Sequence, residues 1–160
     1  MVAVDFSEHS LKAAQYAAGL AKDLDAKLVL VNVLNQRDID VMNEVSLRVP
    51  EISVKKQADE NIAERLSQLE DLSKQIGAGK LDIQTSISIG IPYDVLMQEI
   101  EEKKPDLLVM GAKGRSNVVD MLIGSCAQKM FRSSPIPLLS IRAGESVSAS
   151  SEEVSKGPGE

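Results

Sequence analysis

The sequence predicts an α/β fold, a three-layer doubly wound arrangement in which helices cover both faces of a five-stranded parallel sheet. Short apolar runs alternate along the chain with segments whose apolar residues recur at helical spacing. Residues 107–110 are apolar at every position, which is typical of a central strand covered on both faces. Residues 81–89 alternate strictly between apolar and polar, which is typical of a sheet edge with one buried face. We expect the strand order 3-2-1-4-5.

The chain begins with a strand, a helix and a second strand. Residues 2–4 form a short apolar strand, and residues 7–24 form a helix that Ser7 caps at its N-terminus. Its apolar residues at helical spacing are Leu11, Ala14, Ala18 and Ala21. Residues 28–34 form the second strand. The segment that follows, residues 35–54, is irregular and rich in apolar residues, so we expect it to cover another surface of the protein.

The rest of the chain continues the alternation. Residues 55–76 form the longest helix, which a following glycine ends. After the edge strand, Pro92 takes the first position of a third helix, and this helix ends before Pro105. A last helix covers about residues 125–132, and residues 138–141 form the fifth strand.

Length and composition fit one globular domain, residues 1–143, followed by an acidic tail, residues 144–160, that we expect to be disordered. The net charge of −6 argues against a nucleic-acid or anionic-membrane partner, and the aromatic content of 2% argues against base stacking. The single cysteine, Cys126, excludes an internal disulfide. The sequence shows no signal-peptide core and no long apolar run, so we expect a cytoplasmic protein with no membrane partner.

A glycine-rich loop follows the run 107–110. Gly111-Ala-Lys-Gly114 is followed, after nine residues, by Gly124-Ser125. Glycine lets the backbone approach a ligand closely, and a loop between a strand and a helix N-terminus presents N–H groups to an anion. Lys113 and Arg115 add positive charge to this loop. From these residues alone, a phosphate cradle and a loop whose glycines only serve turns are equally open.

The expected strand order brings two separate features together. In a doubly wound sheet, ligands bind beyond the C-terminal strand ends at the point where the strand order reverses. With the order 3-2-1-4-5, this point lies between strands one and four. Asp5 ends the first strand and Gly111 follows the fourth, so both are expected in one crevice.

Several short motifs occur in a fixed order along residues 1–142. They are Val2-Ala3-Val4-Asp5-Phe6-Ser7-Glu8-His9-Ser10, Gly90-Ile91-Pro92, Pro105-Asp106-Leu107-Leu108-Val109-Met110-Gly111, Gly114-Arg115-Ser116, Gly124-Ser125 and Pro137-Leu138-Leu139-Ser140-Ile141-Arg142. In these motifs and in the glycine spacing G-x2-G-x9-G-(S/T), the chain resembles the universal stress protein family, in its ATP-binding branch. The resemblance implies a Rossmann-like fold of the adenine nucleotide alpha hydrolase type.

The resemblance also implies roles for residues at three strand ends. Ala3 and Asp5 match positions beside the nucleotide, with Asp5 near the ribose or an indirectly bound metal; the alternative for Asp5 is a loop or capping carboxylate. Val33 matches a position whose backbone hydrogen-bonds the adenine edge; otherwise it is a core residue. Met110 and Gly111 match positions that flank the base and the ribose.

Further along, the resemblance implies a set of phosphate contacts. Gly114, Gly124, Ser125 and Cys126 match the phosphate-binding backbone, and the helix that begins near Ser125 would point its positive end at the phosphates. Family members often carry a hydroxyl residue where this chain has Ala127, so one contact is missing, worth about 1 kcal/mol.

Three other side chains have less specific interpretations. Lys113 and Arg115 either compensate for the missing contact or are solvated loop charges. His9 is interpreted as a surface residue of a first helical turn rather than a catalytic group, and Cys126 as a small spacer rather than a nucleophile.

The resemblance therefore implies ATP or another adenine nucleotide as ligand, with Mg²⁺ or Mn²⁺. No Walker lysine loop and no Ser-His-Asp order is present, so we favour a nucleotide-dependent regulator or sensor in the stress response over an enzyme. The alternatives are an interaction protein of the same fold that binds no nucleotide, and a slow ATP hydrolase. The downstream protein partner is unknown.

We also expect a homodimer through residues 138–141. This strand lies at an edge of the expected sheet, and no lysine or glutamate interrupts it. An unguarded apolar edge invites pairing with another chain, and members of the resembled family commonly dimerise in this way. The alternative is that a helix or the tail covers the edge.

Overall fold

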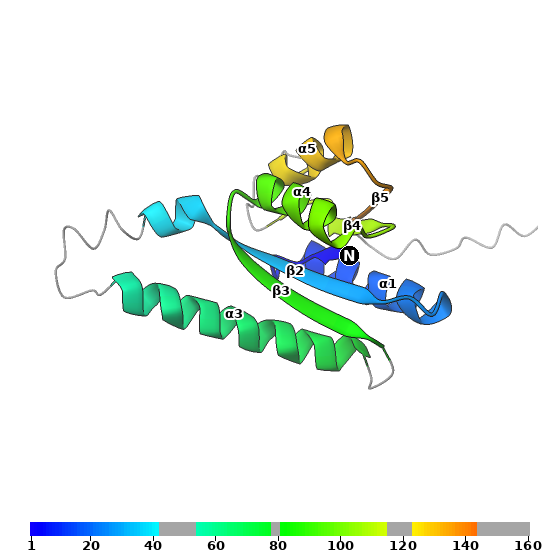
Figure 1. The fold of residues 1–160 in the computed structure, drawn as a ribbon, viewed down its shortest axis with the longest axis horizontal. Coiled ribbons are helices and arrows are strands. Elements are labelled where there is room, and N and C mark those ends of the chain that lie inside the picture. The colour runs from blue at the N-terminus through cyan, green and yellow to red at the C-terminus, as the bar shows by residue number, and fades with distance from the viewer. Residues whose placement is uncertain (42–53, 78–80, 115–122, 144–160) are drawn as a thin grey trace, which may run out of the picture.

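The computed structural model describes residues 1–41, 54–77, 81–114 and 123–143 (Figure 1). The elements in chain order are β1 (Val2–Ala3), α1 (Glu8–Asp23), β2 (Leu28–Asn35), α3 (Val54–Gly77), β3 (Ile83–Gly90), α4 (Pro92–Lys103), β4 (Leu108–Gly111), α5 (Ser125–Ser133) and β5 (Leu138–Ile141). All strand pairs are parallel, and the order is β3-β2-β1-β4-β5. The predicted fold class and strand order are confirmed.

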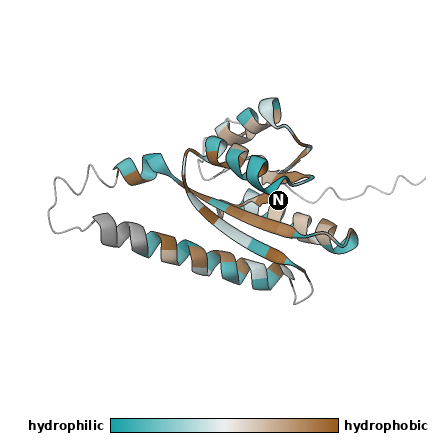
Figure 2. Cartoon of the chain, viewed as in Figure 1, coloured by the Kyte–Doolittle hydropathy of each residue, from teal (hydrophilic) through white to brown (hydrophobic). Residues whose placement is uncertain are grey.

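The helices form two layers, one on each face of the sheet. Helices α1 and α3 pack on one face, and α4 and α5 pack on the other (Figure 1). Each interface has its own aliphatic cluster, one around Leu30 and Leu69 and the other around Leu108 and Met130. Strand β2 is hydrophobic over much of its length because helices cover both of its faces (Figure 2). Within the described residues, no helix is long and apolar enough to cross a membrane.

Helix α1 lies close to the centre of the sheet because its inner face is built from small residues. The buried residues on this face are Ser10, Ala13, Ala14, Ala17, Ala18 and Ala21. Ser7 is the N-cap as predicted, and its hydroxyl accepts a hydrogen bond from the Ser10 N–H at 3.3 Å. The close packing places the first turn of α1 beside the end of β4.

The sequence suggested that the segment 35–54 is irregular, but part of it is regular in the structure. Asn35 ends β2, and residues 36–41 are helical. The Asn35 side chain starts this turn, because its Oδ1 accepts a hydrogen bond from the Arg37 N–H at 3.1 Å. Residues 42–53 lie outside the described residues, and so does the tail that we expected to be disordered.

The polar face of the edge strand β3 was expected to be exposed to water, but part of it packs against α4. Strand β3 begins at Ile83, and its serines face α4 rather than water. The Ser86 and Ser88 hydroxyls donate to Oε1 of Glu99 at 2.9 and 3.2 Å, and Glu99 is 6% exposed. Lys103 Nζ lies 3.2 Å from the other carboxylate oxygen as an ion pair, off the line of a hydrogen bond. A buried acidic side chain thus holds α4 to the sheet edge.

Removing this carboxylate should destabilise the fold. We expect Glu99→Ala to lower the free energy of unfolding by about 2–4 kcal/mol, because two serine hydroxyls and the Lys103 ammonium lose their partner. The matched control is Glu101→Ala on the same helix, where the side chain is exposed, and its effect should stay within about 0.5 kcal/mol. Urea unfolding measures both values. Equal effects of the two substitutions would contradict the assigned role of Glu99.

Candidate functional site

A cavity of about 470 Å³ lies at the carboxyl ends of the central strands, where the strand order reverses. This volume is in the range of small-molecule binding sites. Its lining includes the following residues that the sequence singled out: Ala3, Asp5, Val33, Met110, Gly111, Lys113, Gly114, Gly124, Ser125 and Cys126. Arg115 lies outside the described residues. Asp5 after β1 and the glycine loop after β4 therefore lie in one cavity, as the strand order predicted.

The N-terminus of α5 opens onto this cavity. Gly124 is the N-cap, and it has no side chain with which to cap the helix. The first N–H groups of a helix have no intrahelical carbonyl partner, and here they belong to Ser125, Cys126 and Ala127, which line the cavity. The Gly124 N–H donates to the Ala112 carbonyl at 2.8 Å and ties the helix start to the end of β4. The cavity thus contains a fixed group of N–H donors at the positive end of a helix dipole.

The three glycines of the motif are glycines for different reasons. A Cβ on Gly111 would lie 2.8 Å from His9 Cβ, so a side chain would push α1 away. A Cβ on Gly114 would lie 2.7 Å from Asp5 Oδ2. A Cβ on Gly124 would have its nearest neighbour at 3.4 Å, an ordinary contact, and the φ of −68° suits any residue. Contacts with α1 and with Asp5 therefore account for the first two, while a Cβ on Gly124 would fit against the glycine loop, and Gly124 lines the cavity.

Asp5 is held in a fixed orientation by the start of α1. Its Oδ1 accepts hydrogen bonds from the Ser7 N–H at 3.0 Å and from the Ser7 hydroxyl at 2.6 Å. Phe6 turns the chain with a left-handed φ of 62°, and the Arg65 guanidinium of α3 lies over its ring, 5.1 Å from the centroid. The loop-carboxylate interpretation is thus realised, and the carboxylate also lines the cavity. His9, expected at the surface, is half-buried against Gly111.

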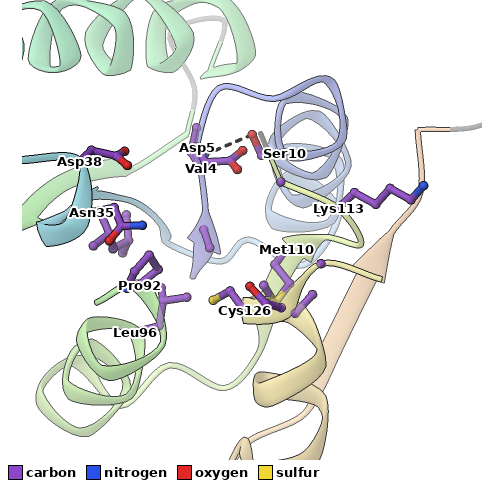
Figure 3. A pocket seen from close by; sticks show the side chains of 18 residues that line it. Val4, Asp5, Ser10, Asn35, Asp38, Pro92, Leu96, Met110, Lys113 and Cys126 are labelled. Atoms are coloured by element: carbon purple, nitrogen blue, oxygen red, sulfur yellow. Dashed lines mark hydrogen bonds between the residues drawn. The ribbon is translucent and has the colours of Figure 1, made fainter. Parts of the chain in front are cut away.

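The two ends of the cavity differ in chemistry. The glycine loop and α5 form one end, and Asn35 at the end of β2 and Asp38 in the helical residues 36–41 form the other (Figure 3). Apolar side chains line the part between them: Val31, Val33, Pro92, Leu96 and Met110. Lys113 reaches the lining, but its side chain extends away from the other labelled residues (Figure 3). The donors that face the cavity from the loop end are therefore backbone groups rather than this ammonium.

The acidic side chains of this region do not form a metal centre by themselves within the described residues. In residues 1–41, 54–77, 81–114 and 123–143, no group of three or more histidine, cysteine or acidic side chains could hold a metal ion. A cation at this site would need ligands from a bound anion as well as from Asp5.

Sequence reasoning missed several lining residues. Val4, Ser10, Val31, Asn35, Asp38, Pro92 and Leu96 were not among the expected site residues, while Ala127, expected at the phosphate site without a hydroxyl, also lines the cavity. The signal for Asn35 and Asp38 was present, since polar residues directly after a predicted parallel strand lie at the carboxyl edge of the sheet. Leu96 carries no such signal, because it is also an ordinary member of the core beside α4 and α5.

Comparisons with known proteins agree with this architecture. The family model described as the universal stress protein family matches residues 1–142. The universal stress protein MJ0531 of Methanocaldococcus jannaschii is 28% identical over 143 residues, which cover 89% of this chain and 80% of that protein. The structure of MJ0577 from the same organism superimposes with a TM-score of 0.76 at 20% identity, covering 91% and 96% of the two chains. A universal stress protein in complex with cAMP superimposes with a TM-score of 0.63 at 24% identity, covering 89% and 93%.

The single cysteine gives a chemical probe of the cavity. Burial raises the pKa of the Cys126 thiol to about 11; the nearby Asp5 carboxylate acts in the same direction, and Lys129 acts against both. Because only the thiolate reacts, we expect the alkylation rate with iodoacetamide to rise about tenfold per pH unit from about pH 7 to about pH 10. Mass spectrometry measures the rate, and circular dichroism verifies the fold at each pH. A rate that levels off near the ordinary thiol pKa of about 8.5 would contradict the raised value.

Proposed function

The chain belongs to the universal stress protein family, and we propose that it holds ATP or another adenine nucleotide in the cavity between β1 and β4. The observation that carries the proposal is the N-terminus of α5 at Gly124, which has no side-chain cap and lines the cavity with Ser125, Cys126 and Ala127. The cAMP complex of a structural relative supports an adenine nucleotide as the class of ligand.

The phosphates belong at the loop end of the cavity. The N–H groups of Ser125, Cys126 and Ala127 lie at the positive end of the α5 dipole, and the Ser125 hydroxyl adds a donor. Gly114 keeps the loop in contact with Asp5, so the Asp5 carboxylate lies beside the phosphate end of the cavity. Ala127 is buried and offers no hydroxyl, so its contribution to phosphate binding is limited to its backbone.

The base belongs at the opposite end, beside β2. Val31, Leu96 and Met110 line the apolar part of the cavity between this end and the glycine loop, and their lining continues into the core. A purine ring is flat and largely apolar on its faces, so it suits the space between these side chains. The Val33 backbone, at the end of β2, offers hydrogen bonds to the edge of the ring.

A divalent cation would enter together with the phosphates. Mg²⁺ keeps several waters and uses one or two carboxylates plus substrate phosphates. Asp5 is the acidic side chain nearest to the glycine loop that the cavity contains, and its hydrogen bonds to Ser7 fix its direction. We therefore assign Asp5 as an indirect ligand of Mg²⁺ or Mn²⁺, through water.

The proposed role is regulatory rather than catalytic. Nucleotide occupancy would join β2, the β1–α1 loop and α5 through one ligand, and a protein partner would sense the resulting surface. Cys126 is a poor nucleophile near neutral pH because burial raises its pKa. Measured ATP hydrolysis at more than a slow rate would replace this proposal with an enzymatic one.

Substitution at Gly124 tests the nucleotide site. We expect Gly124→Val to weaken ATP binding at least about 30-fold, or about 2 kcal/mol, because the new side chain fills phosphate space. Isothermal titration calorimetry with ATP and Mg²⁺ measures the affinity. We expect the substitution to preserve the fold, since the added Cβ makes only ordinary contacts.

The matched control is Gly19→Val. Gly19 lies on the exposed side of α1 and has nothing within 4 Å of an added Cβ, so ATP affinity should not change. Equal ATP affinity in wild type and Gly124→Val would contradict the phosphate site. No ATP binding by the wild type would favour the alternative, an interaction protein of this fold that binds no nucleotide.

We also propose that the chain forms a homodimer through β5. Strand β5 is an edge of the sheet within the described residues, and its two faces are already covered, Leu138 by the α4–α5 layer and Leu139 by the α1–α3 layer. The carbonyls of Pro137 and Ile141 accept hydrogen bonds from β4. Backbone groups alternate in direction along a strand, so those of Leu138 and Ser140 point outward and can pair with a second copy.

A proline in β5 tests the dimer without disturbing the core. Ser140 is exposed, and its N–H points away from β4, so Ser140→Pro removes an outward donor and no internal hydrogen bond. We expect the dimer dissociation constant to rise at least about tenfold, with Ser140→Ala as the matched control. Sedimentation equilibrium measures the constant. A wild type that remains at 17.3 kDa at every concentration would exclude the dimer.

A further inference from the structure

We propose that Asn35 and Asp38 make the site selective for adenine, which carries an amino group at position 6, over purines with an oxygen at that position, such as hypoxanthine. The inference rests on the proposed function, because it concerns the base end of the nucleotide cavity. It adds two side chains from the end of β2 that recognise the base edge directly, in addition to the backbone of that strand.

The position of these two residues in the cavity is the first argument. Both line it at the end opposite the glycine loop and α5 (Figure 3). With the phosphates held at the helix N-terminus, the apolar lining between the two ends receives the sugar and the ring faces. The edge of the base then reaches Asn35 and Asp38.

The orientation of the Asn35 amide is the second argument. Its Oδ1 accepts the hydrogen bond from the Arg37 N–H at 3.1 Å, so the oxygen is directed back to its own chain. The Nδ2 group is left on the cavity side (Figure 3). Because the oxygen is fixed, Asn35 presents a donor to a ligand and not an acceptor.

Asp38 supplies the complementary group. It lies in the helical residues 36–41, next to Asn35 on the cavity lining. An ionised carboxylate only accepts hydrogen bonds, and its two oxygens can serve several donors at once. The end of the cavity therefore presents one donor and one strong acceptor side by side.

This pair matches adenine and conflicts with a 6-oxo purine. On adenine, the 6-amino group donates and the adjacent ring nitrogen accepts, so the amino group meets Asp38 and the ring nitrogen meets Asn35. In hypoxanthine an oxygen replaces the 6-amino group. This oxygen and the Asp38 carboxylate, both hydrogen-bond acceptors, would then face each other. Asp38 is exposed at the rim of the cavity, so the repulsion between the two acceptors is moderate, but it still favours adenine.

The chain offers a matched control two residues away. Asp40 lies in the same helical residues, its Oδ1 accepts a hydrogen bond from Gln36 Nε2 at 2.9 Å, and it is absent from the cavity lining. Asp40→Asn removes the same charge as Asp38→Asn. A long-range effect of charge on a triphosphate would therefore appear equally in both variants.

The experiment compares ATP with ITP by isothermal titration calorimetry with Mg²⁺, in wild type, Asp38→Asn and Asp40→Asn. ATP and ITP carry the same charge, so the ratio of their dissociation constants reports on the base edge alone. We expect a ratio of about tenfold in favour of ATP in wild type and in Asp40→Asn. In Asp38→Asn the ratio should fall at least about threefold, because an amide can donate to the 6-oxygen.

The outcomes separate this inference from the function beneath it. ATP binding with the same ATP-to-ITP ratio in wild type and Asp38→Asn would overturn the inference and leave the nucleotide site standing. An equal fall in Asp40→Asn would also overturn it, since charge rather than contact would then be the cause. If wild type binds neither ATP nor ITP, the proposed function is wrong and the inference is wrong with it.

Discussion

The close contact between the end of β4 and the first turn of α1 is the constraint on which the rest of the structure depends. Gly111 permits it, because its missing side chain leaves room for His9 Cβ and the Ser10 N–H, which would lie 2.8 and 2.9 Å from a Cβ. The contact brings the loop after β1 against the loop after β4. Without it, Asp5 would not meet Gly114, and the two halves of the sheet would leave no shared cavity.

The sequence was sufficient for the architecture because each element follows from a local pattern. Hydrophobic periodicity, the Ser7 cap and Pro92 at a helix start all act over a few residues, and each was found where expected. The strand order followed from chain connectivity and the difference between an alternating strand and a fully apolar one. The ends of β1 and β4 could be placed in one crevice because the strand order decides which ends are neighbours.

The features that the sequence did not reveal depend on pairings between distant residues. Glu99 looks like any surface residue of an amphipathic helix, yet Ser86 and Ser88 of another element bury it. The exposed Ile89, at 47%, was expected on the buried face, and no local rule separates the two cases. Asn35 is an exception, because its contact with the Arg37 N–H is local; it was missed because the apolar residues after it suggested a covering loop.

The different roles of the three glycines have an evolutionary consequence. At Gly111 a side chain would strike the backbone of α1, so any substitution there is tested first by folding, whereas at Gly114 it would strike the Asp5 carboxylate, a residue of the cavity. At Gly124 an added Cβ makes only ordinary contacts, so the change acts mainly on the cavity. A lineage could therefore abandon the ligand through one codon while keeping a stable fold, and could regain it as easily. Substitutions at Gly124 among related proteins would therefore show where the ligand was lost or regained, independently of changes that affect the stability of the fold.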